Sequence, residues 1–272
     1  MTHLSLDLTV DFKRQVLEGT ATCSVDVQPG STSVIFDTRD LHIASVTVDG
    51  QPVQDFQLGD SVEYLGQALR VPVTTGKHSV SIRYLTSPQA AALQWLSPQQ
   101  TAGKKYPFLF TQSQAILART WAPVQDSPGI RFTYDATLHV PDGLMAVMSA
   151  ENPTARSKDG VYRFKMEQAI PAYLLALAVG DFDYHRYDDR SGVYAEPATL
   201  PMAADEFTDL SKMITAAEQL YGPYAWGRYD LIILPPSFPF GGMENPRVTF
   251  ATPTIIAGDK SLTTLVAHEL AH

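Results

Sequence analysis

The end of the sequence carries the residues whose types and spacing are most specific for chemistry. His268 and His272 enclose Glu269 in the pattern His-Glu-x-x-His. On an α-helix, positions i and i+4 lie on one face about a turn apart, so both imidazoles can reach one zinc ion. Zinc lowers the pKa of a bound water toward neutrality, and Glu269 can then take its proton as a general base. The pattern predicts amide hydrolysis, and its structural alternative is a helix end with two solvated histidines.

A second motif precedes this one and combines two glycines with a carboxylate. It consists of Pro239, Phe240, Gly241, Gly242, Met243, Glu244 and Asn245. Paired glycines let a backbone approach a ligand closely and leave N–H and C=O groups free to pair with an extended peptide. The fixed charge of Glu244 would suit a free α-ammonium group. Recognition of that group would restrict a peptidase to cleavage at the N-terminus of its substrate. A Gly-Gly turn beside a solvated glutamate explains the same residues equally well.

A third stretch, Gln112, Ser113 and Gln114, is a weaker candidate. Two glutamines at i and i+2 share one face of a strand and could line a polar cleft. Taken alone, they fit the wet side of a strand at least as well.

The elements that must position these motifs change character near residue 188. Before it, apolar and polar residues alternate with a period of two, for example over 4–12 and 132–140, and turn signals such as Asp49-Gly50 separate the runs. We expect an antiparallel all-β domain over 1–188, ending with a buried strand over 169–180.

The remaining segment, 189–272, changes to a period of about 3.6 and forms a second predicted domain. The pattern predicts a helix over 207–221, buried or extended segments over 231–234 and 248–256, and a helix over 261–272. Asp259 or Ser261 is the predicted N-cap of the last helix.

The composition excludes several classes of protein. The 272 residues are 44% hydrophobic, which excludes a disordered chain, and their net charge of −9 argues against nucleic-acid or anionic-membrane partners. The single cysteine, Cys23, cannot form an intramolecular disulfide, no export signal is visible, and the most apolar run is too short to span a membrane. These observations favour a cytoplasmic protein.

Together the three motifs resemble the M1 zinc aminopeptidases, and within that family the leukotriene A4 hydrolase branch. The likeness rests on HELAH at 268–272, GGMEN at 241–245 and AALQWLSPQQTAGKKYPFLFTQSQA at 91–115, and it extends over YLLALAVGDF at 173–182 and the stretch 229–262. It implies an all-β, saddle-like N-terminal domain followed by the start of an α+β, thermolysin-like catalytic domain.

The resemblance also implies roles for individual residues. His268 and His272 would be Zn²⁺ ligands and Glu269 the general base, while Glu244 would bind the substrate's free amino group. The peptide groove would be lined by Gln112, Ser113, Gln114, Pro239, Phe240, Gly241, Gly242 and Met243. Phe240 stands where some relatives have a tyrosine.

The resemblance also indicates what the 272 residues lack. The family's third zinc ligand, a glutamate 19 positions after the second motif histidine, would fall at position 291. We therefore expect the chain to be the N-terminal part of a longer enzyme and to be inactive alone.

The expected activity of the complete protein is removal of N-terminal residues from peptides, and epoxide hydrolysis stays undecided. A rival hypothesis is a non-catalytic β-domain binding module or pseudoenzyme. A zinc endopeptidase is a third, which leaves the Gly-Gly-Met-Glu-Asn motif unexplained.

Overall fold

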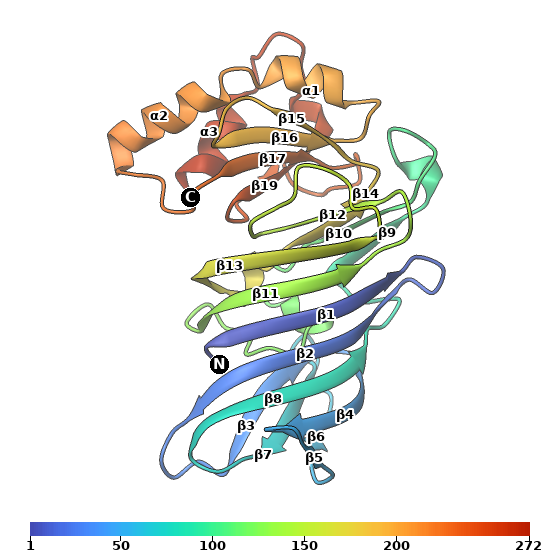
Figure 1. Cartoon of the computed structure of the whole chain (residues 1–272), viewed down its shortest axis with the longest axis vertical. Helices are drawn as coiled ribbons and strands as arrows, with labels where there is room; N and C mark the ends of the chain where they lie inside the picture. The colour runs from blue at the N-terminus through green and yellow to red at the C-terminus, as the bar shows by residue number, and fades with distance from the viewer. The chain divides into compact units, whose positions relative to one another are not determined.

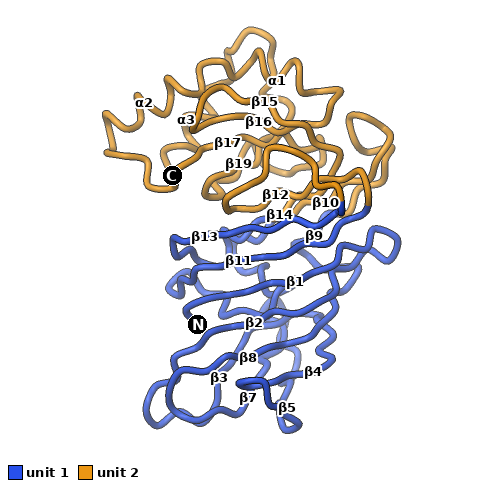
Figure 2. The backbone as a smooth tube through the Cα atoms, viewed as in Figure 1, with its two compact units in different colours: residues 1–94, 111–141, 159–176 blue, residues 95–110, 142–158, 177–272 orange.

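The structure is a computed structural model that describes all 272 residues, and it contains two compact units (Figure 2). Each unit draws on several segments of the chain. Unit 1 comprises residues 1–94, 111–141 and 159–176, and unit 2 comprises residues 95–110, 142–158 and 177–272. The division at residue 188 stays a prediction about domains.

Unit 1 is built on a seven-stranded sheet in the order β13-β11-β1-β2-β8-β4-β5 (Figure 1). Its strands are β1 (His3–Asp11), β2 (Val16–Val27), β4 (His42–Val48), β5 (Gln51–Val53), β8 (Gly76–Leu85), β11 (Arg131–His139) and β13 (Val161–Pro171). The alternating sequence explains the sheet, because Leu4, Leu6 and Leu8 are buried while their neighbours face outward. One pairing corrects the antiparallel prediction: β1 and β11 run parallel. Residues this far apart in the chain can meet only in the folded unit.

A smaller sheet completes unit 1 behind the large one in Figure 1. It contains β3 (Ser33–Thr38), β7 (Gln67–Pro72) and β6 (Gln57–Leu58). Phe36 of β3 and Leu69 of β7 are fully buried, and so is Cys23 of β2, as its place in an alternating strand predicts. The all-β prediction for this part of the chain is confirmed.

A four-stranded sheet in the order β12-β14-β10-β9 belongs largely to unit 2. Its strands are β9 (Leu93–Leu96), β10 (Phe108–Thr111), β12 (Met145–Met148) and β14 (Leu177–Gly180). The single strand predicted over 169–180 is wrong. β13 ends at Pro171, a 3-10 turn occupies Ala172–Leu174, and only then does β14 begin. A run of apolar residues shows burial but not where the backbone turns.

The second sheet of unit 2 has five strands in the order β15-β16-β17-β19-β18 and carries helices on one face (Figure 1). Its strands are β15 (Asp183–Arg186), β16 (Ser191–Ala195), β17 (Tyr229–Ile233), β18 (Gly242–Met243) and β19 (Val248–Ala251), and the helices are α1 (Leu200–Glu206), α2 (Leu210–Tyr221) and α3 (Thr264–Ala271). β16, β17 and β19 are parallel neighbours, and the two outer strands are antiparallel to them.

Two predicted helix boundaries need correction. The helix expected over 207–221 begins at Leu210, because Phe207 closes α1 and Asp209 forms the N-cap of α2. The last helix begins at Thr264 with Thr263 as N-cap. Asp259 instead accepts the Ser261 N–H at 3.0 Å and shapes the turn before the helix.

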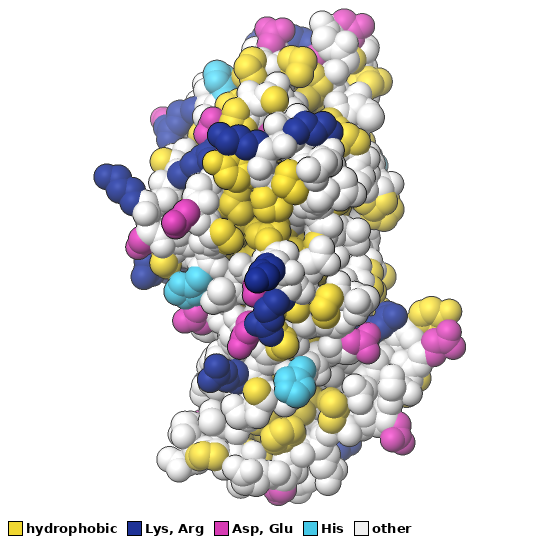
Figure 3. Space-filling model, turned by 90° about the vertical axis from the view of Figure 1, so that its right-hand side faces the viewer, with side chains coloured by type: hydrophobic (Ala, Val, Ile, Leu, Met, Phe, Trp, Pro, Cys, Tyr) yellow, Lys and Arg dark blue, Asp and Glu magenta, His cyan; other side chains and the backbone are white.

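None of the three helices is long and apolar enough to span a membrane. On the face drawn in Figure 3, basic and acidic side chains are interspersed, and hydrophobic side chains gather mainly over unit 2.

Candidate functional site

Helix α3 presents one apolar face and one polar face, and this positions the His-Glu-x-x-His motif. Val266 and Leu270 are buried in the core that α1, α2 and the five-stranded sheet share. Because they are four positions apart, Val266 and Leu270 lie on one side of the helix. His268 and His272 lie exposed on another side.

The side chains of the two histidines contact each other. Their Nε2 atoms are 3.2 Å apart. Two nitrogens that each lie 2.0–2.1 Å from a tetrahedral zinc would be separated by about 3.3 Å. The pair therefore fits a tetrahedral metal, although the structure groups no third His, Cys, Asp or Glu with it.

Glu269 lies between the histidines in sequence but is buried, with 7% of its surface exposed. Burial raises the pKa of its carboxyl group, and the negative charge of Glu244 raises that pKa further, whereas His268 and His272 lower it. A carboxylate with a raised pKa is a stronger proton acceptor, which is the property a general base needs.

Strand β18 lies against α3 and forms the edge of the five-stranded sheet. A side-chain carbon placed at Gly242 would lie 2.3 Å from Oε1 of Glu269, and one at Gly241 would lie 3.1 Å from Leu265. Only glycine permits this close approach with the present side-chain positions. The strand pairs with β19 on one side and is the last strand of the sheet.

Glu244 follows β18 at a tight turn. The backbone N–H of Asn245 donates to the carbonyl of Met243 at 2.9 Å, which leaves the half-buried Glu244 at the centre of the turn. The two motifs predicted from the sequence, Gly-Gly-Met-Glu-Asn and His-Glu-x-x-His, thus lie side by side within unit 2.

The residues before the glycines form an aromatic edge to this site. Phe240 is 49% exposed, and its ring lies 6.0 Å from that of the buried Phe238. Phe238 in turn contacts Phe110 at 5.7 Å between ring centroids. Pro239 is exposed and Met243 is buried. Phe240 is therefore the aromatic member of this group that a ligand side chain could contact.

Gln112, Ser113 and Gln114 belong to unit 1 and follow β10 directly. Ser113 is buried; its hydroxyl donates to the carbonyl of Leu175 at 3.1 Å and accepts from the indole N–H of Trp121 at 3.0 Å. Gln112 is half-buried and Gln114 is exposed. Their assignment to a peptide groove stays a prediction.

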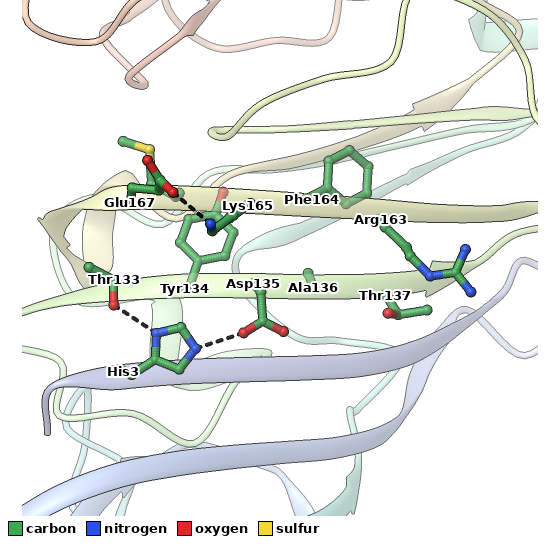
Figure 4. Close-up of a pocket in the computed structure, with 11 residues that line it drawn as sticks. His3, Thr133, Tyr134, Asp135, Ala136, Thr137, Arg163, Phe164, Lys165 and Glu167 are labelled. Atoms are coloured by element: carbon green, nitrogen blue, oxygen red, sulfur yellow. Dashed lines mark hydrogen bonds and ion pairs between the residues drawn. The ribbon is translucent and has the colours of Figure 1, made fainter.

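A cavity of about 570 Å³ lies over β1, β11 and β13 of unit 1 and is lined by neither of the two motifs (Figure 4). Most of its charged groups are paired with one another. His3 contacts Asp135 and Thr133, each at 2.7 Å, and Lys165 contacts Glu167 at 2.6 Å. The His3 contacts bridge the parallel strands β1 and β11. These side chains therefore stabilise the pairing of the two strands, and we assign no binding site to the cavity.

Two buried carboxylates near α1 could not be recognised from the sequence. Glu196 precedes the helix and Glu206 ends it, and each accepts two backbone N–H groups from a distant loop. Neither residue has a partner at a recognisable spacing, so only the folded structure could reveal them.

Comparison with known proteins now decides the family. Residues 1–174 match the Peptidase M1 N-terminal domain, and residues 206–272 match the Peptidase family M1 domain. The chain belongs to the M1 peptidase family. The resemblance stated from the sequence motifs is confirmed.

The relatives of this M1 chain include proteins named as leukotriene A-4 hydrolases and proteins named as aminopeptidases. It is 43% identical over 99% of its length to leukotriene A-4 hydrolase of Xenopus laevis, and 42% identical over its whole length to leucine aminopeptidase 2 of Yarrowia lipolytica. The structure of native yeast LTA4 hydrolase matches all of the chain with a TM-score of 0.94 and 37% identity. The chain spans 46%, 42% and 43%, respectively, of these three proteins.

Proposed function

We propose that the complete protein is a zinc aminopeptidase that hydrolyses the first peptide bond of substrates with a free N-terminus. His268 and His272 would hold the zinc, which when bound would polarise the peptide carbonyl and acidify water. The 3.2 Å separation of their Nε2 atoms supports this assignment. The names of the relatives that are aminopeptidases support the reaction class.

Glu269 is the proposed general base. It would take the proton of the attacking water and pass it to the nitrogen of the scissile bond, so that the amine leaves as a neutral molecule and not as an amide anion. Its burial excludes competing solvent and its raised pKa strengthens it as a base.

Glu244 and β18 would select the N-terminus of the substrate. An extended peptide would pair with the outer edge of β18, because Gly241 and Gly242 carry no side chains to obstruct it. The carboxylate of Glu244 then lies where it can accept the α-ammonium group. Phe240 would contact an apolar substrate side chain, and Gln112 and Gln114 remain proposed groove residues. A cytosolic location completes the proposal, which rests on the single cysteine, Cys23, since a fold without disulfides does not depend on an oxidising compartment.

The observation that carries the proposal is the packing of α3 against β18, which puts the His-Glu-x-x-His helix beside the peptide-binding edge. The test is Glu269→Gln in the protein at its full natural length. We expect kcat on aminoacyl amides to fall by about 10²–10⁴-fold while the bound zinc, measured by atomic absorption, stays at the wild-type level.

His268→Ala is the companion variant and should lose both zinc and activity. Unchanged turnover in Glu269→Gln would reject the mechanism. A wild-type protein with neither zinc nor turnover would favour the non-catalytic binding module.

A further inference from the structure

Glu206, the last residue of α1, makes contacts that no part of the proposed reaction uses. Its side chain is 2% exposed and takes part in none of the ion pairs of the structure. Oε2 accepts the N–H of Gly258 at 2.7 Å, and Oε1 accepts the N–H of Lys260 at 2.9 Å. Burying a carboxylate is costly unless such charge-assisted hydrogen bonds offset the loss of water.

The segment that Glu206 holds is the turn immediately before the metal-binding helix. Gly258 and Lys260 both have positive φ, at +82° and +61°, so the chain here forms a tight turn and not the start of the helix. The carbonyl of Lys260 accepts the Thr263 hydroxyl at 2.9 Å, and α3 begins one residue later. His268 follows four residues after the first residue of the helix.

Helix α3 depends on such external support. Most of the stability of a helix in a protein comes from the packing of its apolar face, so tertiary contacts set the direction of α3. Val266 and Leu270 fix the face that it buries, and Leu265 lies against Gly241. These apolar contacts limit rotation about the helix axis, whereas the turn at 258–260 fixes where the axis begins.

We propose that Glu206 is a positioning residue for the zinc site: its carboxylate holds the turn at 258–260 and thereby sets the placement of His268 and Glu269. This inference rests on the proposed function, since it assumes that His268 and His272 bind zinc. Glu206 touches neither metal nor substrate and acts through the backbone of the turn.

The structure supplies a matched control in Glu196, at the other end of α1. Its side chain is 6% exposed, and its carboxylate accepts the N–H groups of Ala102 and Gly103 at 2.8 and 3.1 Å. The chemistry is the same as that of Glu206, but the loop held here carries no candidate site residue. A purely structural effect should therefore be alike in the two variants.

The experiment compares Glu206→Gln with Glu196→Gln in the protein at its full natural length. Glutamine keeps one acceptor oxygen and turns an amide N–H₂ toward the second backbone N–H, so each variant loses one bond. We expect the zinc dissociation constant, measured by chelator competition, to rise on the order of tenfold in Glu206→Gln and to stay within about twofold in Glu196→Gln. The visible spectrum of the cobalt-substituted protein should change only in Glu206→Gln, and kcat should fall there without a matching rise in KM.

A second measurement needs no variant, which matters if Glu206→Gln fails to fold. Coupling between two sites is reciprocal, so zinc must slow hydrogen exchange at the amides of Gly258 and Lys260 and leave those of Ala102 and Gly103 unchanged. Equal exchange with and without zinc at Gly258 and Lys260 would overturn the proposal, as would equal zinc affinities of the two variants. A wild-type protein that binds no zinc would reject the proposed function, and this inference with it.

Discussion

Gly242 and Gly192 show how differently two glycines constrain the same unit. A methyl group at Gly242 meets the end of the flexible Glu269 side chain at 2.3 Å, whereas one at Gly192 meets the Tyr184 ring at 2.0–2.5 Å. The Tyr184 ring cannot rotate away, because its hydroxyl donates to Asp230 and its face lies against Tyr194. We expect Gly242→Ala to change the free energy of unfolding by less than about 1 kcal/mol and Gly192→Ala to lower it by about 3 kcal/mol. Urea denaturation of both variants measures this difference, and equal losses would show that the Glu269 side chain is fixed.

Glu244 gives the residue-scale prediction for specificity. A charge-assisted hydrogen bond to an ammonium group contributes about 1.5–3 kcal/mol. We therefore expect Glu244→Gln to lower kcat/KM for aminoacyl amides by roughly 10–150-fold and to leave hydrolysis of N-acetylated analogues unchanged. The acetylated substrates serve as the control. Equal losses on both substrate classes would argue against recognition of the amine by Glu244.

At the scale of elements, the pairing of β1 with β2 depends on one close backbone approach. Gly19 faces Leu8 in the register, and a side-chain carbon there would lie 1.9 Å from the carbonyl oxygen of Asp7. Backbone atoms of a central strand cannot move aside, so Gly19→Ala should destabilise unit 1 by about 3 kcal/mol or more. The control is Gly30→Ala, which has φ +87° and open space around it and should cost only about 1–2 kcal/mol of backbone strain. Denaturation followed by tryptophan fluorescence compares the two, and a mild effect at Gly19 would contradict the register.

The elements also show what could be predicted from the sequence and what could not. Strict alternation identified β1 and β11, because each buries one face against a core. Alternation says nothing about partners, so the parallel pairing of β1 with β11 was missed. The His-Glu-x-x-His and Gly-Gly-Met-Glu-Asn motifs were found because their spacing is local. Glu206 was missed because its partners at 258–260 are distant in the chain and are backbone groups, which leave no trace in residue types.

At the scale of the whole molecule, the single cysteine reports on opening of the β unit. Cys23 lies fully buried in β2, and burial raises the pKa of its thiol from 9.0 to about 12. The thiolate is the reactive form, so a thiol that is both inaccessible and protonated should not react with 5,5′-dithiobis(2-nitrobenzoate) near pH 8 in the native protein. We expect labelling to occur at the rate at which unit 1 opens, and to accelerate in Gly19→Ala. Immediate labelling of the native wild type would show that the reagent reaches Cys23 in the folded unit, which would contradict its burial.

The same thiol makes stability depend on alkaline pH, and the sign follows from the direction of the shift. Because the pKa is higher in the folded than in the unfolded state, the unfolded chain loses the proton first as pH rises. The contribution of the protonated thiol is complete below about pH 9, the ordinary pKa of a thiol, and is lost progressively up to about pH 12. Tyr84 acts in the same direction, since burial also raises the pKa of its phenol, whose hydroxyl donates to the carbonyl of Trp121.

Cys23→Ala should therefore be less stable than wild type at pH 7, because the substitution leaves a small cavity. Between pH 8 and pH 11 the variant should lose less stability than wild type, because it has no thiol to ionise. Parallel pH profiles for the two proteins would show that the thiol is already ionised, or already exposed, in the folded state.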